Sequence, residues 1–178
     1  MNQLTPAAQK FIIHWGEMGE RWGINRTVAQ IHALLYISPE PLNAEEISET
    51  LSVARSTVSA GLKELQNWGI IKIAHVLGDR TDHFEAMGDV WEMARIIVDM
   101  RKRRELDPTL NMLREAAAEF DNDNETALTR KRLADMLDLL ETVSVIYEQG
   151  QKIPTKTIAR IAKNSEIVRK VLNLFPDS

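Results

Sequence analysis

Apolar residues recur near the start of the chain at steps of three and four, the spacing that places side chains on one face of a helix. The first series is Phe11, Trp15, Met18 and Trp22, and the second is Val28, Ile31, Leu34 and Leu35. The two series predict helices over about residues 5–23 and 26–37. Thr5 followed by Pro6 is typical of a helix start. The segment Ser38-Pro39-Glu40-Pro41 predicts the end of the second helix, because proline lacks the N–H that a helix needs.

Two shorter helical patterns follow, separated by a tight turn. Asn43 is a typical N-cap for the first, and Ile47 and Leu51 give this helix a buried side. The turn is Ser52-Val53-Ala54, with Val53 predicted as its buried anchor. The second of these helices therefore begins at about residue 55.

The helix from Arg55 to about Trp68 turns its apolar residues toward a core. These are Val58, Leu62 and Leu65. Gly61 costs about 1 kcal/mol relative to Ala inside a helix, which indicates close packing against a neighbouring helix. After Gly69, β-prone residues over 70–76 and 81–86 flank a Gly78-Asp79-Arg80 turn and predict a hairpin. Helix, turn, helix and hairpin together form the outline of a winged helix-turn-helix.

The second half of the chain is predicted to be helical. Helices are expected over residues 89–105 and 107–120, with a polar break at residues 121–124. Two narrow stripes follow: Leu133, Met136, Leu140, Val143 and Tyr147, then Ile158, Ile161, Ser165, Val168, Leu172 and Phe175. Such stripes indicate helices that pack against each other or against a second subunit. The fold class is therefore mainly α with a small β-hairpin. Residues 1–87 would hold the N-terminal helix and the winged helix-turn-helix, and residues 88–178 a helical dimerisation or regulatory region.

Composition excludes several functions. The chain of 178 residues has no cysteine, which excludes disulfides, thiolate catalysis and thiolate-bound metal. No signal pattern and no apolar run of membrane-spanning length is found, so we expect a cytoplasmic protein without a membrane partner. No nucleophile elbow, zinc-protease motif or phosphate-binding loop occurs. We therefore expect neither an enzyme nor a cofactor.

Four segments also carry a resemblance to a known family. They are residues 34–42, Ile47 through Leu65, Gly78-Asp79-Arg80 and residues 103–110. In this order they resemble the GbsR-type regulators of the MarR-like winged-helix group, over roughly residues 11–113. The resemblance implies a homodimeric transcriptional regulator with one winged helix on each subunit. Some relatives sense choline-like compounds, but no ligand-binding residue here can be matched. Ala54 departs from the family pattern, since Ser commonly caps the recognition helix there.

The start of the helix at Arg55 supplies the predicted DNA contacts, because short, polar or basic side chains can approach base edges and phosphates. The candidates are Arg55, Ser56, Thr57, Ser59 and Lys63, with Arg80 on the hairpin tip for a minor groove. The net charge of residues 43–86 is nevertheless −3, from four basic and seven acidic residues. A dimer on two half-sites of duplex DNA is therefore expected to supply the affinity. Repression relieved by a small-molecule effector is the simplest mode of action, and activation stays open.

Other interpretations remain beside these. The winged helix could be an adaptor that docks a protein partner. The basic run 101–104 reads as a solvated helix end or as a DNA clamp, with the helix end favoured. His75 and His83 could face each other across the hairpin, although two histidines are weak evidence for a metal. Gly16, Gly19 and Gly23 indicate close helix packing. The four tryptophans, Trp15, Trp22, Trp68 and Trp91, could line an aromatic cage but fit a core better.

Overall fold

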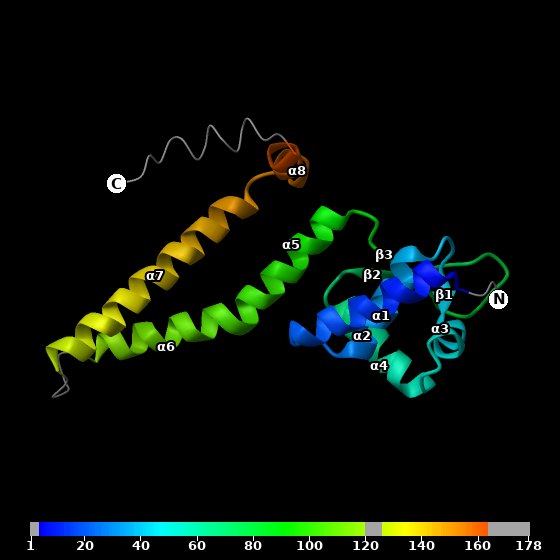
Figure 1. The fold of residues 1–178 in the computed structure, drawn as a ribbon, viewed down its shortest axis with the longest axis horizontal. Coiled ribbons are helices and arrows are strands. Elements are labelled where there is room, and N and C mark those ends of the chain that lie inside the picture. The colour runs from blue at the N-terminus through cyan, green and yellow to red at the C-terminus, as the bar shows by residue number, and fades with distance from the viewer. Residues whose placement is uncertain (1–3, 120–125, 164–178) are drawn as a thin grey trace. The chain divides into compact units, whose positions relative to one another are not determined.

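The computed structural model describes residues 4–119 and 126–163, and these divide by their internal contacts into two units. Unit 1 runs to Ile96 and unit 2 begins at Ile97. The boundary falls inside helix α5 (Val90–Arg101). Figure 1 shows the helices and the small sheet of unit 1 and the long helices of unit 2. The predicted assignment of roles to residues 1–87 and 88–178 stays a prediction.

Unit 1 begins with two helices whose bounds match the sequence pattern. They are α1 (Pro6–Arg21), capped by Thr5 with Pro6 at its first position, and α2 (Arg26–Ile37), capped by the side chain of Asn25. The two helices pack so closely that there is no room for a side chain at either glycine. A Cβ added to Gly16 would lie 2.7 Å from Gln30 Cγ, and one added to Gly19 would lie 2.6 Å from Ala29 Cβ. The predicted close packing is confirmed at Gly16 and Gly19 but is wrong at Gly23, where an added Cβ would meet nothing within 4 Å and a φ of +73° at the end of the helix favours glycine instead.

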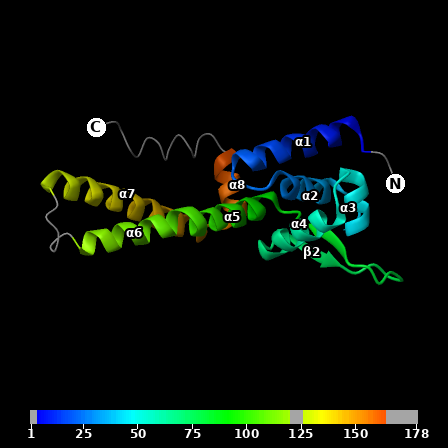
Figure 2. The same cartoon turned by 90° about the horizontal axis from the view of Figure 1, so that it is seen from below.

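The helix-turn-helix is formed by α3 (Ala44–Leu51) and α4 (Arg55–Asn67). The core side of α4 is as predicted, since Val58, Leu62 and Leu65 are at most 2% exposed. A Cβ at Gly61 would lie 2.7 Å from Ile31 Cδ1, so this glycine lets α4 approach α2. Figure 2 shows α2 between α1 and α4. The core of unit 1 therefore lies around α2, with Ile31 and Leu34 at its centre.

The sheet of unit 1 has one more strand than the sequence pattern indicated. Strand β3 (His83–Ala86) pairs antiparallel with β2 (Ile71–Ala74) and also with the two-residue strand β1 (Leu42–Asn43), in the order β1-β3-β2. Both hairpin strands are shorter than predicted. The sequence pattern does not predict β1, because two residues are too few to show an alternation of apolar and polar positions. Pairing with β3, about 40 positions further along the chain, is what makes these residues a strand.

Unit 2 continues α5 without a break into a π-helical turn (Lys102–Leu106) and then into α6 (Asp107–Ala118). The residue that precedes α6, Leu106, has helical dihedral angles and no capping side chain. The sequence-based separation of two helices near residue 106 is therefore wrong. The interpretation of residues 101–104 as a helix end is wrong as well. Pro108 lacks an N–H, and the wider hydrogen-bonding register of the preceding π turn carries the helix through this region.

The remaining helices of unit 2 are α7 (Ala127–Gln151) and α8 (Thr155–Lys163). Helix α7 lies alongside α6 (Figures 1 and 2), where Leu110 and Leu113 are buried and Arg114 Nε lies 3.0 Å from Glu141 Oε1. The predicted break at residues 121–124 and the stripe beyond residue 163 lie outside the described residues.

The predicted stripe on α7 is only partly covered. Leu133, Leu140 and Tyr147 are half-buried, but Met136 is 48% and Val143 40% exposed. Within the described part of the chain, no helix is both long enough and apolar enough to cross a membrane.

The tryptophans differ in part from the predicted core positions, since Trp22 and Trp91 are exposed.

Candidate nucleic-acid interface

Local hydrogen bonds fix the turn that leads into α4. Asn43 accepts from the backbone N–H of Glu45 and Glu46, and Glu46 accepts in return from the N–H of Asn43, which completes a capping box. At the other end of α3, Ser52 adopts the left-handed region with a φ of 55°. The Ser48 hydroxyl donates to the carbonyl of Val53 over 2.7 Å. Val53 itself is half-buried, so the predicted anchor is partly covered.

The N-terminus of α4 lacks a side-chain cap. Ala54 holds the N-cap position in extended geometry, and no side chain accepts from the first N–H groups. The departure seen in the sequence is therefore present in the structure, and the helix still begins at Arg55. These free N–H groups, at the positive end of the helix dipole, can bind an anion such as a phosphate.

All six predicted contact residues are exposed in unit 1. Ser56, Ser59 and Lys63 share one face of α4, since they lie three or four residues apart. Arg55 and Thr57 flank this face at its N-terminal end. We call these five residues the α4 strip. Sequence reasoning left out Ala60 and Asn67, which are also exposed on this face and could have been found from the same spacing. The opposite face of α4 is buried, so the strip has one orientation with respect to the core.

Two ion pairs lie within the helix-turn-helix and the wing, and they leave the net charge of −3 unchanged. Arg55 lies 3.2 Å from Glu45, and Lys72 lies 2.8 Å from Glu85. Both pairs are exposed to solvent, so each is worth little in stability and can rearrange when a phosphate approaches. Lys63 and Arg80 form no ion pair with any described residue. They are therefore the more available cations of the interface.

The wing is the loop between β2 and β3, and its acidic residue organises it. Asp79 accepts from the N–H of Thr81 over 2.8 Å, and this bond holds the pKa of Asp79 below its usual range. Gly78 takes a φ of +85°, which only glycine adopts without strain. Arg80 is exposed in this loop, so its predicted position at the wing is confirmed.

The two wing histidines do not face each other. His83 is buried and pairs in the sheet with Ala74, while His75 lies beyond the end of β2 and is exposed. The Nδ1 of His83 lies 2.9 Å from the carbonyl of Thr81, and its Nε2 lies 3.7 Å from Asp79. The prediction that His75 and His83 face each other is wrong, because the sequence does not show which residues of the two hairpin strands pair. Across the described residues no cluster of three metal-ligating side chains occurs.

Comparisons with known proteins agree with this geometry. Residues 17–80 match the model of the MarR family. The chain is 25% identical over 137 residues to the HTH-type transcriptional repressor GbsR of Bacillus subtilis (strain 168). This alignment covers 74% of this chain and 75% of the relative. This similarity agrees with the resemblance seen in the sequence motifs.

A solved structure shares the fold. This crystal structure of a transcriptional regulator superposes with a TM-score of 0.63 at 18% identity, covering 87% of this chain and 99% of that one. The transcriptional regulator Tm0710 from Thermotoga maritima gives a lower TM-score of 0.39 at 20% identity, over 83% of this chain and 94% of that one. The winged helix, the match of residues 17–80 to the MarR family model and the similarity to GbsR agree with one another, so this chain is similar to transcriptional regulators of the MarR family.

Proposed function

We propose that this protein is a cytoplasmic repressor that binds duplex DNA in a sequence-specific manner as a homodimer. One observation carries the proposal. The α4 strip is polar or basic and exposed, while Val58, Leu62 and Leu65 on the opposite face of the same helix are buried in the core. A helix held in this way can enter a major groove without disturbing its own domain. The similarity to the B. subtilis repressor supports the sign of the regulation.

In the proposed complex, each α4 strip lies in a major groove. Arg55 and Lys63 supply charge, and Ser56, Thr57 and Ser59 are short enough to let the helix approach the bases. The uncapped N–H groups at the start of α4 contact a phosphate. Arg80 of the wing reaches the flanking minor groove, where a narrow groove concentrates negative potential.

The second copy is proposed to pack on an exposed stripe of α7. Met136, Leu139, Val143 and Ile146 follow one another at steps of three, four and three, and each is at least 40% exposed. This is the spacing of a helix–helix seam. We call these four residues the α7 stripe. Two subunits joined in this way would read half-sites about 34–36 Å apart or a multiple of it.

The DNA-binding part of the proposal is tested by fluorescence anisotropy with DNA from upstream of the protein's own gene, over a series of salt concentrations. Binding should select this DNA over random duplex and weaken as salt rises. Lys63→Ala and Arg80→Ala should each weaken it, and each substitution that removes a cation from a phosphate should lower the salt slope by about 1. Lys10→Ala is the matched control, because Lys10 is exposed on α1, across α2 from α4 (Figure 2).

Two results would count against the proposal. If Lys63→Ala and Arg80→Ala bound as tightly as Lys10→Ala, the contact surface would lie elsewhere. If no genomic fragment were selected over random duplex, the winged helix would act as an adaptor for a protein partner.

A further inference from the structure

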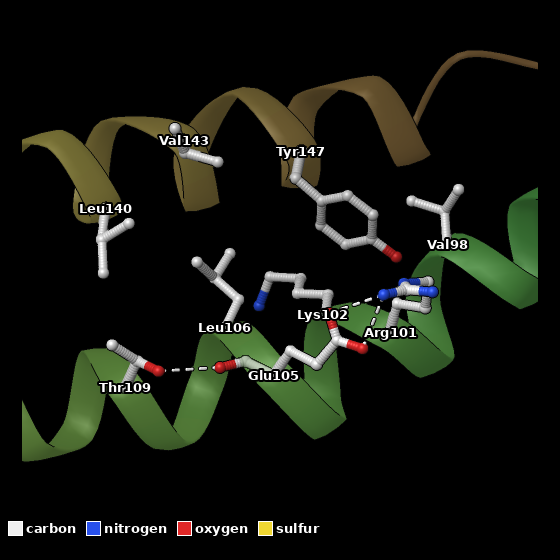
Figure 3. Close-up of a pocket in the computed structure, with 9 residues that line it drawn as sticks. All are labelled: Val98, Arg101, Lys102, Glu105, Leu106, Thr109, Leu140, Val143 and Tyr147. Atoms are coloured by element: carbon white, nitrogen blue, oxygen red, sulfur yellow. Dashed lines mark hydrogen bonds and ion pairs between the residues drawn. The ribbon is translucent and has the colours of Figure 1, made fainter. Parts of the chain in front are cut away.

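Unit 2 contains a groove of about 500 Å³ that the DNA-binding role does not use. It lies between the π-helical turn with its flanking residues and α7, as Figure 3 shows. Its walls are largely apolar and include Val98, Leu106, Leu140 and Val143. Its size falls within the range of small-molecule sites. Single π-helical turns inside α-helices are frequent at functional sites.

Two cations line this groove, Arg101 and Lys102, and Lys102 is the more buried of the two. Its side chain is only 14% exposed, and its Nζ lies 2.6 Å from Asp107 Oδ1 and 5.4 Å from the centre of the Tyr147 ring. Figure 3 shows the side chain running below Tyr147, with its ammonium group beside Leu106. An ammonium group has three N–H donors. One carboxylate and one ring face therefore leave it able to donate to a further acceptor inside the groove.

The other polar groups of the groove are already engaged. Arg101 Nη2 lies 2.8 and 3.0 Å from the two carboxylate oxygens of Glu105. The Tyr147 hydroxyl donates to Asp99 Oδ1 over 2.7 Å and accepts from Gln151. Burial and the bond to Asp99 raise the pKa of Tyr147 to about 12, so the hydroxyl stays neutral. The group left to bind a ligand is the Lys102 ammonium, which keeps its ion pair with Asp107 and lies beside the apolar walls of the groove.

We propose that this groove binds a monocarboxylate with a short apolar body. The carboxylate accepts from the Lys102 ammonium, and such charge-assisted bonds are short and strong when water is excluded. The apolar body lies on Leu106, Leu140 and Val143, where its removal from water supplies the remaining affinity. The site lies within unit 2, so its test is separate from that of the proposed DNA contacts, although Val143 also belongs to the proposed α7 stripe.

The test uses sodium octanoate as the probe and the full-length chain. Isothermal titration calorimetry should give saturable binding with one site per chain, and octan-1-ol, which has the same tail without the charge, should bind at least ten-fold more weakly. Lys102→Gln should weaken octanoate binding at least ten-fold. Lys131→Gln is the matched control, since Lys131 pairs with Asp135 on an exposed face of α7 and does not line the groove.

A second measurement keeps the test independent of any variant's folding. In the unsubstituted protein, octanoate should shift the methyl NMR signals of Leu106, Leu140 and Val143, and leave those of Ile31 and Leu65 in unit 1 unchanged. Equal binding of octanoate and octan-1-ol would overturn the proposal, as would unchanged binding by Lys102→Gln. Groove signals that shift with protein concentration and not with octanoate would mean that a second copy fills the groove, and the proposal would fail.

Discussion

The two units of this protein differ in how far their apolar side chains are buried. In unit 1, Ile31, Leu34, Ile47, Val58, Leu65 and Ile70 are each at most 2% exposed. In the described part of unit 2, only Leu110 and Leu113 among the apolar residues are buried, while Leu139 and Ile146 are more than half exposed. Both units have ordinary helical patterns. The difference is therefore in what lies opposite each apolar face.

This contrast shows which unit supplies its own stability. Helices α1, α2 and α4 and the sheet surround a common core, so burial of apolar surface stabilises unit 1 within one chain. Helix α7 packs on α6 with one side and leaves a second apolar side uncovered. A row of exposed apolar side chains on one helix is the kind of surface that the proposed second copy would cover. We therefore expect the stability of unit 1 to be independent of protein concentration, and the stability of unit 2 to rise when a partner covers α7.

The largest expected effect separates the two units directly. Leu65→Ala removes a fully buried side chain from unit 1 and should lower the free energy of unfolding by about 2–5 kcal/mol. Leu139→Ala makes the same change on α7, where the side chain is 54% exposed, and should cost less than about 0.5 kcal/mol at a concentration where the protein is monomeric. Urea unfolding measures both. Equal losses would mean that α7 is covered within one chain, and the contrast would be wrong.

The second prediction concerns His32, which is 3% exposed between the rings of Trp15 and Tyr36. Burial lowers the pKa of His32 to about 4, and its Nε2 has no hydrogen-bond partner among the described residues. The unfolded chain binds a proton near pH 6.5 and the folded chain does so only near pH 4. Stability is therefore retained above pH 6.5 and lost as the pH falls toward 4, by about 3 kcal/mol in total.

Urea unfolding at several pH values checks this effect. His32→Leu should flatten the dependence between pH 6.5 and 4, whereas His14→Leu, at an exposed position on α1, should leave it unchanged. An unchanged slope in His32→Leu would show that other groups cause the acid sensitivity.

The third prediction tests the exposed side of unit 2. Ile146→Glu places a charge on the α7 stripe in both copies of a dimer and should raise the dimer dissociation constant at least 100-fold, about 2.7 kcal/mol. Val145→Glu is the matched control, because Val145 is also more than half exposed but lies off the stripe. Sedimentation equilibrium gives both constants. If Val145→Glu weakened the dimer as much as Ile146→Glu, a different face of α7 would hold the partner.

The smallest expected effect is at the start of α4, the proposed recognition helix. Ala54→Ser adds the missing N-cap and should stabilise the protein by about 1 kcal/mol. Ala60→Ser makes the same chemical change inside α4 and should destabilise it by about 0.5 kcal/mol. Thermal unfolding resolves the two signs. A loss of stability in Ala54→Ser would mean that backbone geometry at residue 54 excludes the cap.

Much of the candidate interface could be predicted from the sequence because its signals are local. Asn43 caps α3, Gly61 allows close packing on Ile31, and Arg80 lies in the wing loop, each as the sequence pattern predicts. The exposed side of α4 follows from the spacing of its three buried residues. The ion pair between Arg55 and Glu45 was not readable, since it depends on how two helices are placed across the turn.

By itself, the sequence determined where helices begin and end in unit 1 and which side of α4 faces outward, because capping and periodicity act within a few residues. Only the tertiary structure decided that β1 joins the sheet, that His83 is buried, and that the chain continues as helix through residues 102–106. It also decided which of the overlapping apolar stripes on α7 stays exposed. These outcomes depend on residues distant in the chain, whose burial and pairing override local preference.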